Sequence, residues 1–399
     1  MQSDRLLSFV TKRVSTRMAG VFLAVGFLAV GLVIPAIGQD RPANGNAPQS
    51  PEQTNAAIDE AVSLGISFLK NRGQSADGFF SPESGVAVTG LCVRAILENR
   101  PTEVDSPAVK KALQVILDHV QPDGGIYVKG SRHRNYETSV AVGALVAANR
   151  DDRFDSQLKR AEAFLKEIQW DEGEGVTPAD PAYGGAGYGS HSRPDLSNTS
   201  FMIDALRDLG NDANDEAIKK ALIFVSRSQN LAGHGNDLPH ATAEGDGGFY
   251  YTPAAGGETK VVGGDTRDAG GGLRSYGSIS YAGFKSLIHA GLTESDPRVI
   301  AAMNFIQDHY SLTENPGMGQ AGLYYYYHTF AKALHAAKIR VLTDADGNNH
   351  FWNRELVMTL TDVQQDDGSW VNRASDRWME GNRNLVTAYS LLALSYCRE

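Results

Sequence analysis

The chain has 399 residues, of which 42% are hydrophobic and 21% charged, a composition typical of a globular protein with a sizeable core. Its net charge of −10, without a lysine- or arginine-rich stripe, excludes nucleic acid as an expected partner. Cys92 and Cys397 are the only cysteines and lack metal-ligand spacing, which excludes a disulfide framework and a zinc finger.

The N-terminus has the pattern of a targeting signal. Four basic residues, Arg5, Lys12, Arg13 and Arg17, precede an uncharged run over 18–38 that ends in Ala36-Ile37-Gly38. We therefore predict a signal peptide over residues 1–38 and a periplasmic or extracellular protein. The run is also long enough to span a bilayer, so membrane association through an uncleaved anchor stays open. Residues 39–55, rich in Pro, Asn and Gln, are predicted to form a flexible linker.

From residue 56 onward the sequence repeats an amphipathic helix followed by a glycine-rich turn. Apolar residues recur with helical spacing over 57–69, 109–120, 158–168 and 218–225. The turns read Asp77-Gly78-Phe79-Phe80, Asp123-Gly124-Gly125-Ile126-Tyr127, Tyr183-Gly184-Gly185, Asp246-Gly247-Gly248-Phe249-Tyr250 and Asp367-Gly368-Ser369-Trp370. Asp and Gly tolerate a positive φ and end the first helix, and the aromatic residue can then pack over the turn.

A second helix, apolar nearly all round and rich in small residues, is predicted after each turn, over 86–97, 136–148, 198–209, 276–290, 325–337 and 385–395. Such helices suit an inner ring covered by the amphipathic helices. We therefore predict an all-α fold, an (α/α)6 toroid of about six helix-turn-helix repeats in two concentric rings, as one domain over 56–399. An open tetratricopeptide-like solenoid is the alternative, and the irregular turn spacing disfavours it. Closure of the ring could bring Cys92 and Cys397 together as a disulfide, whereas buried thiols are the simpler interpretation.

Two segments carry a family resemblance. Gln365-Asp366-Asp367-Gly368-Ser369-Trp370 resembles the glutamine–tryptophan motif of squalene cyclases, and Tyr327-His328-Thr329 resembles a late segment of protein prenyltransferase β subunits, where the histidine binds zinc. Gly247-Gly248-Phe249 with Tyr276 is similar to the turn that leads to the other zinc ligands of that family. The chain thus resembles the terpenoid cyclase and protein prenyltransferase superfamily over about residues 56–397, at the level of repeats. The resemblance implies a toroid that encloses an apolar, isoprenoid-like small molecule.

The catalytic motifs of both families differ in this chain. Leu273 and Ser275 stand where the prenyltransferases carry an Asp-x-Cys pair, and His328 alone cannot hold zinc, so no metal or cofactor is predicted. The Asp-x-Asp-Asp acid of squalene cyclases is also missing. Three functions therefore stay open: cyclase- or transferase-like catalysis, a non-catalytic extracytoplasmic binding or scaffold role, and a polysaccharide-processing α/α barrel enzyme. The last would need facing carboxylates or a Ca²⁺ site.

Loops before the inner helices should converge on the mouth of a cavity, and their polar residues are the site candidates. The candidates for catalysis are His328, Asp265 and Asp268; a core histidine and a hydrated turn are the alternative interpretations. Arg132, His133 and Arg134 could bind an oxyanion or form a solvated basic loop. The predicted aromatic lining, for an apolar ligand or a sugar ring, consists of Tyr136, Tyr276, Tyr281, Tyr327 and Trp370, although aromatic residues at this spacing also suit a core.

Overall fold

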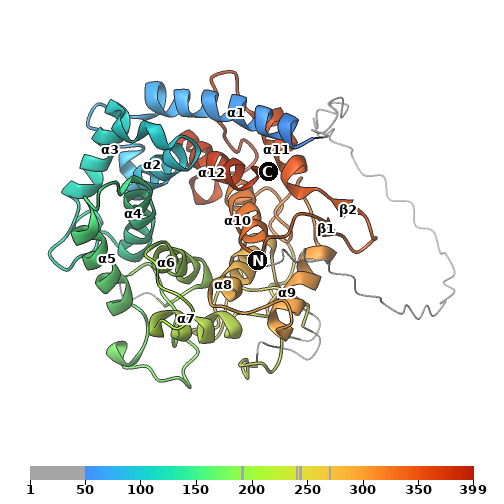
Figure 1. Ribbon diagram of the computed structural model, residues 1–399. Helices are drawn as coiled ribbons and strands as arrows, with labels where there is room; N and C mark the ends of the chain where they lie inside the picture. Colours follow the sequence, from blue (N-terminus) through green and yellow to red (C-terminus); the bar gives the residue numbers. More distant parts are fainter. Residues whose placement is uncertain (1–49, 190–192, 240, 242–244, 269–270) are drawn as a thin grey trace, which may run out of the picture. The chain divides into compact units, whose positions relative to one another are not determined.

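The computed structural model describes residues 50–189, 193–239, 241, 245–268 and 271–399 (Figure 1). The predicted signal peptide and most of the predicted linker lie outside this range. Among the described helices, none combines the length and the hydropathy needed to cross a bilayer.

The unit that spans Pro48–Glu399 is built from alternating helices. The odd-numbered helices are α1 (Pro51–Phe68), α3 (Pro107–Asp118), α5 (Asp155–Glu167), α7 (Glu216–Arg227), α9 (Pro297–Asp308) and α11 (Trp352–Val363). The even-numbered helices are α2 (Ala87–Asn99), α4 (Arg134–Ala148), α6 (Leu196–Asp208), α8 (Gly277–His289), α10 (Leu323–Ala336) and α12 (Arg383–Tyr396). A two-stranded antiparallel hairpin, β1 (Leu342–Thr343) and β2 (Asn349–His350), precedes α11. Short π- or 3₁₀-helical segments are η1 (Leu69–Gly73), η2 (Pro82–Ser84), η3 (Pro101–Asp105), η4 (Glu172–Glu174) and η5 (Arg377–Met379).

The even-numbered helices form a closed inner ring. Each packs against the next even-numbered helix, from α2 through α12, and α12 packs against α2. The odd-numbered helices lie outside them, as the end-on view in Figure 1 shows. The predicted (α/α)6 toroid is therefore confirmed. Small residues on the inner helices allow this close approach; a β-carbon on Gly90 in α2, for instance, would lie 3.0 Å from Val140 in α4.

Each of the five predicted glycine turns docks on an outer helix of the following repeat. Gly184 has a φ of 82°, and a β-carbon there would lie 1.8 Å from the Lys220 carbonyl oxygen in α7. Gly368, in the last repeat, has a φ of 86°, and a β-carbon there would lie 2.3 Å from the Leu64 carbonyl oxygen in α1. Only glycine meets both conditions. The last turn thus contacts the first outer helix, α1, in the same way that each other turn contacts the outer helix of the following repeat. This contact closes the ring.

In four of the five turns, a glutamine at the end of an outer helix ties the turn to the next repeat. Gln364 Nε2 donates to the carbonyl oxygens of Gly368 (2.9 Å) and Ala61 (3.0 Å). Gln74, Gln169 and Gln229 make the equivalent pair of bonds in their own turns. The motif was predicted to start at Gln365, but Gln365 donates to the Val363 carbonyl instead. The prediction was wrong by one residue, because two glutamines are adjacent and only Gln364, the C-cap of α11, reaches α1.

A hydroxyl group of the inner helix completes each unit. Trp370 donates its backbone N–H to Thr387 Oγ1 at 3.1 Å, and its indole N–H to the Leu360 carbonyl at 2.8 Å. Thr89, Thr138, Thr199 and Ser280 accept the same backbone bond after the other turns. The residue after each turn is thus buried with its backbone donor satisfied.

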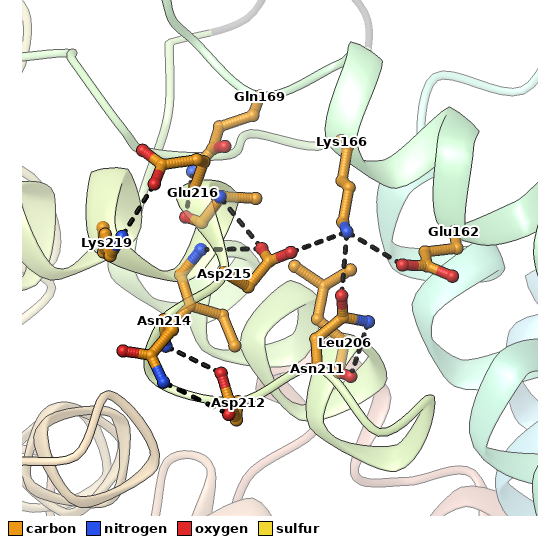
Figure 2. Close-up of polar contacts among 12 residues, drawn as sticks. Glu162, Lys166, Gln169, Leu206, Asn211, Asp212, Asn214, Asp215, Glu216 and Lys219 are labelled. Carbon is orange, nitrogen blue, oxygen red and sulfur yellow. Dashed lines mark hydrogen bonds and ion pairs between the residues drawn. The ribbon is translucent and has the colours of Figure 1, made fainter.

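Lys166 links neighbouring outer helices (Figure 2). Its Nζ donates to Glu162 Oε1, Asn211 Oδ1 and Asp215 Oδ2, each at 2.8 Å. Asp215 Oδ1 also accepts the backbone N–H of Ala217 at 2.9 Å, which caps α7. One ammonium group therefore holds α5, the α6–α7 loop and the start of α7 in place.

One boundary prediction changes in the structure, and of the two interpretations of the cysteines the structure agrees with buried thiols. Helix α1 begins at Pro51, with Ser50 as its N-cap, so the predicted linker ends before residue 55. Both cysteines are free. Cys92 Sγ lies 3.6 Å from the Asn384 carbonyl oxygen at the start of α12, whereas Cys397 follows the end of that helix. Since α12 has 14 residues, about 20 Å of helix separates the two thiols, and they cannot form the disulfide that ring closure suggested.

Candidate functional site

A cavity of about 620 Å³ lies at the N-terminal ends of the inner helices. All six inner helices contribute residues from their first turns, which shows that these helices point their N-termini toward the cavity. Aromatic residues form much of the lining: Tyr136, Tyr188, Phe201, Tyr251, Tyr276, Tyr325, Trp378 and Tyr389. The size and lining are those of a small-molecule site.

Four aromatic side chains from four inner helices form a ring in which each contacts the next. We call these residues the aromatic floor: Tyr136, Phe201, Tyr325 and Tyr389. Phe201 lies edge-on to Tyr136 with the ring centroids 5.0 Å apart, and stacks on Tyr325 at 6.2 Å. Tyr325 contacts Tyr389 at 5.9 Å, and the hydroxyls of Tyr389 and Tyr136 lie 3.4 Å apart. Burial raises the pKa of Tyr136 to about 12, so the phenol stays neutral.

Buried carboxylates hold the loops around the cavity at the helix N-termini. Glu137 Oε2 accepts the backbone N–H groups of Val86 (3.2 Å) and Val128 (3.1 Å). Asp195 caps α6 by accepting the Asn198 backbone N–H at 2.9 Å. Free amides and the positive end of the helix dipole favour carboxylates at such positions.

Glu380 reaches the start of α10 from the loop before α12. Its Oε1 accepts the backbone N–H groups of Tyr324 and Tyr325, both at 2.9 Å, and its Oε2 accepts Asn372 Nδ2 at 2.7 Å. The residue is 1% exposed and lines the cavity. Burial raises the pKa of Glu380 to about 7, although these hydrogen bonds act against the increase. Glu380 therefore exchanges its proton near neutral pH.

An ionic layer lies further along the inner helices, toward their C-termini: Arg94, Asp204, Asp208, Lys285 and Lys332. Asp204 Oδ2 accepts Nζ of Lys285 and, at 2.7 Å, Nζ of Lys332. Arg94 forms a bidentate ion pair with Asp208, with hydrogen bonds of 2.5 and 3.2 Å. On α10, Lys332 follows the floor residue Tyr325 by two helical turns, so it lies on the same face of the helix. The layer thus lies below the aromatic floor and away from the cavity.

The structure brings part of the predicted site together. Tyr136, Tyr276 and His133 line the cavity. Arg132 and Arg134 are adjacent in sequence to His133 but are not lining residues, and the Arg134 guanidinium lies over the Tyr127 ring, 5.8 Å from its centroid.

His328, the predicted polar centre, is buried below the cavity. Its ring stacks on Tyr389 with the centroids 5.5 Å apart, and Nδ1 has no hydrogen-bond partner among the described residues. Burial, together with the charges of Lys332 and Lys285, holds the pKa of His328 well below its usual range. A neutral histidine between the aromatic floor and the ionic layer matches the alternative interpretation of a core residue.

The remaining predicted aromatic residues pack in the protein interior. Tyr281 contacts Phe330, with the ring centroids 5.0 Å apart, and Tyr327 donates its hydroxyl to the Leu312 carbonyl at 2.6 Å. Trp370 is fully buried at its turn. None of the three is a lining residue of the cavity.

Asp265 and Asp268 lie in a second hollow, of about 460 Å³, with Arg267, Arg274 and His309. Asp268 Oδ1 accepts the Gly272 backbone N–H at 2.8 Å, as in a polar turn. Within the described part of the chain, no group of three or more His, Cys, Asp or Glu residues is arranged to hold a metal ion.

The sequence analysis did not single out Glu380, Glu137, Phe201 or Tyr389. One signal was available, since Trp378-Met379-Glu380 places a carboxylate in the loop before the last inner helix. The sequence alone could not show that this loop turns inward over the cavity.

Residues 76–253 match the family model of the squalene-hopene cyclase C-terminal domain. The predicted resemblance to the terpenoid cyclase-like superfamily is confirmed. A variant of the type II terpene cyclase MstE from Scytonema, in its apo form, has a TM-score of 0.51 at 12% identity and covers 87% of this chain and 98% of its own. This terpenoid cyclase-like fold is shared more widely. A family 76 glycoside hydrolase from a bovine Bacteroides thetaiotaomicron strain has a TM-score of 0.53 at 13% identity, covering 84% of this chain and 77% of its own.

A polysaccharide lyase is also similar, with a TM-score of 0.51 at 12% identity over 86% of this chain and 98% of its own. Among the curated proteins no significant match is found. Structural likeness at such identities shows the fold alone, so the function must be argued from the cavity.

Proposed function

We propose that this chain is an exported terpenoid cyclase-like protein whose cavity encloses an apolar ligand of the isoprenoid class. The observation that carries the proposal is the aromatic floor beneath a cavity of about 620 Å³. Ring faces offer an apolar ligand a large contact area and weak electrostatic attraction to electron-poor carbon. The match to the squalene-hopene cyclase model and the likeness to a terpene cyclase support this choice of ligand class.

We further propose that Glu380 is the proton donor of a cyclase-like reaction. Protonating an alkene needs a carboxylic acid that stays neutral, and a pKa of about 7 leaves roughly half of the Glu380 side chains protonated at neutral pH. The acid lines the cavity, whereas the Asp-x-Asp-Asp run of the squalene cyclases is missing from this chain.

A polysaccharide-processing activity has weaker support. Glu137 and Glu380 both line the cavity, but both oxygens of each side chain accept hydrogen bonds from protein groups. A nucleophile or base would have to give up these bonds, whereas a protonated Glu380 that carries its proton on Oε2 keeps both backbone bonds to Oε1.

The ligand class can be tested with the mature protein and three probes, squalene, geranylgeraniol and a neutral oligosaccharide, in titration calorimetry. We expect the isoprenoids to bind, and Phe201→Ala to weaken their binding about tenfold because the floor loses one of its four rings. Phe351→Ala removes a phenylalanine that is 47% exposed outside the cavity, and it should change nothing. Binding of the oligosaccharide in place of the isoprenoids would overturn the proposal.

Turnover is tested separately from binding. Cyclisation conserves mass, so product is sought as an isomer of the bound isoprenoid by chromatography coupled to mass spectrometry. We expect Glu380→Gln to abolish the isomer while it leaves affinity within a few-fold of the wild type. Tight binding without any product from the wild-type protein would instead establish a binding or scaffold role.

Export is tested by fractionation of the native host and mass spectrometry of the N-terminus. We expect a chain that begins close to residue 39 in the extracytoplasmic fraction. An intact N-terminus in the membrane fraction would indicate an anchor, and a cytoplasmic chain would refute export.

A further inference from the structure

The hairpin formed by β1 and β2 connects α10 to α11 and lies on the outside of the ring (Figure 1). Its strands pair antiparallel, with Leu342 opposite His350. Asp344 organises the turn between them, since its Oδ1 accepts the backbone N–H groups of Asp346 (3.0 Å) and Asn348 (2.8 Å). A hairpin this short is not stable by itself, so contacts with the neighbouring helices must hold it in place.

His350 links the hairpin to two neighbouring elements. Its Nε2 lies 3.1 Å from Asp344 Oδ2 at the hairpin turn, and its Nδ1 lies 2.9 Å from Glu355 Oε2 in the first turn of α11. The imidazole ring stacks on Tyr310, with the ring centroids 4.0 Å apart, and the Tyr310 hydroxyl donates to the same Glu355 oxygen at 2.8 Å. The titratable groups that face the ring thus come from the hairpin, from α11 and from the segment that follows α9.

This geometry requires a charged imidazole ring. A neutral imidazole donates a hydrogen bond from one nitrogen only, and the lone pair of the other nitrogen would then face a carboxylate oxygen. Burial acts against the charge, but the hydrogen bonds and charges of Asp344 and Glu355 outweigh it and raise the pKa of His350 above its usual value of 6.5. The three side chains are between 18% and 29% exposed, so water screens these interactions only in part.

We propose that His350 acts as a pH-operated latch, whose charged ring holds the hairpin against α11 and whose deprotonation releases it. Without the proton, the carboxylates of Asp344 and Glu355 lose their shared cation, and one of them loses its hydrogen bond. The latch lies on the outer wall of the ring, and none of its residues lines the cavity.

Release of the hairpin would change the surface of the protein. Leu342 is 1% exposed, whereas Val341 before it and Phe351 after the second strand are 39% and 47% exposed. The Trp352 indole donates to the Ile339 carbonyl oxygen at 2.7 Å, and this bond does not involve the latch, so it keeps the base of the hairpin attached. An open hairpin thus presents a wider apolar patch, formed by Val341, Leu342 and Phe351.

The direction of the switch follows from the pKa. Because the folded protein raises the pKa of His350, the latch contributes its full stability below pH 6.5 and loses it as the pH rises through the folded value. Tyr310 does not reverse this direction, since burial holds its pKa far above its usual range and its hydroxyl stays a donor. Loss of a hydrogen bond to a charged group corresponds to about a tenfold larger opening equilibrium for the hairpin.

The test is hydrogen exchange of the mature protein, followed by mass spectrometry at about pH 5.5 and about pH 9 and corrected for the intrinsic effect of pH on amide exchange. We expect peptides over 342–350 to exchange about tenfold faster, after this correction, at the higher pH. Peptides from the inner helix α6 are the internal reference and should not change.

Substitutions assign the effect to the ring of His350. His350→Gln removes the titratable group, so the hairpin of this variant should exchange fast at both pH values. His350→Arg supplies a permanent cation and should keep exchange slow at both. His335→Gln removes an exposed histidine on α10, outside the hairpin, and should retain the wild-type response.

Equal corrected exchange of the wild-type hairpin at the two pH values would overturn the latch, and this measurement stands by itself if a variant does not fold. An unchanged pH response in His350→Gln would overturn it too, because another group would then control the hairpin. Faster exchange that extends through α6 would show a loosening of the whole ring in place of a released hairpin, with the same consequence.

Discussion

Asp204 is a buried residue whose loss the structure predicts to be costly. It lies at the centre of the ionic layer, and one of its oxygens accepts both Lys285 and Lys332. The side chains of Lys285 and Asp204 are 3% and 7% exposed, so solvent cannot replace the missing charge. Asp204→Asn keeps the shape of the side chain and removes the counter-ion of two lysines from α8 and α10.

The magnitude follows from the two lysines. With Asp204 present, burial lowers the pKa of Lys285 from 10.5 to about 8, which already costs about 3 kcal/mol at 1.36 kcal/mol per unit. Without Asp204 a lysine that folds in its neutral form at pH 7 costs at most about 5 kcal/mol, one pKa unit more than the present cost, so Lys285 adds at most about 1.4 kcal/mol. Burial also acts against the charge of Lys332, and the attraction of Asp204 together with those of Tyr396 and Asp208 raises its pKa despite burial. Without Asp204, Lys332 would also fold in its neutral form, at a cost of at most about 5 kcal/mol at pH 7. The expected total, about 3–5 kcal/mol, is the range for breaking a buried ion pair.

Urea unfolding followed by circular dichroism measures this loss, with Asp362→Asn, an exposed aspartate on α11, as the control that should change stability by less than about 0.5 kcal/mol. The difference should shrink as the pH rises toward 10.5, because the unfolded lysines then lose their protons too. The triple variant Asp204→Leu, Lys285→Met, Lys332→Met should recover most of the stability, since an apolar replacement leaves no charge unpaired. A loss below about 1 kcal/mol for Asp204→Asn would refute the reasoning.

Three further predictions concern the turns and the cavity acid. Gly184→Ala should destabilise the protein by more than about 3 kcal/mol, because a β-carbon there would lie 1.8 Å from a backbone carbonyl oxygen. The control Gly175→Ala has a similar φ and open space around it, so it should cost about 1 kcal/mol; thermal unfolding measures both. Gln364→Ala should lower the free energy of unfolding by about 1–3 kcal/mol, because two carbonyl oxygens lose their hydrogen-bond donor, and Gln365→Ala should lower it by less than about 0.5 kcal/mol. Equal losses in denaturant titrations would contradict the assignment of the motif to Gln364. Glu380 has a folded pKa of about 7 against 4.5 unfolded, so its stabilisation is full below pH 4.5 and lost as the pH rises through 7. The change is about 3 kcal/mol, and Glu380→Gln should remove that part of the pH profile.

The fold could be predicted from the sequence because its repeating contacts are local. A glycine with a positive φ, such as Gly368, is required by a turn that can be read directly from Asp367-Gly368. The periodicity of the outer helices and the small residues of the inner helices then leave few ways to bury both sets of apolar faces. The sequence did not show which of two neighbouring residues makes a given contact. Which of Gln364 and Gln365 bridges to α1 depends on the direction of a side chain at the end of a helix.

The site was harder to predict, because it is made of residues from six helices and several long loops. Tyr136 and Tyr276 could be predicted from their place at the start of inner helices, and both line the cavity. Tyr281 and Tyr327 also lie on inner helices, but Tyr281 packs against Phe330 of α10 and Tyr327 donates to Leu312 in the loop after α9, and which side of a helix faces the cavity depends on its rotation about its axis. Glu380 reaches the cavity through the segment before α12, where Trp378 and Met379 have positive φ, and the sequence shows the carboxylate there but not the direction of the loop.

The parallel inner helices explain how charge is distributed along the axis of the ring. Their N-termini all meet the cavity, so the positive ends of six helix dipoles favour the buried carboxylates Glu137 and Glu380 there. The negative ends favour the lysines of the ionic layer. Lys260 and Arg193 lie over the ring of the cavity residue Tyr251, and Glu258 pairs with both of them. Local ion pairing therefore determines where these two cations lie, against the positive potential of the helix ends.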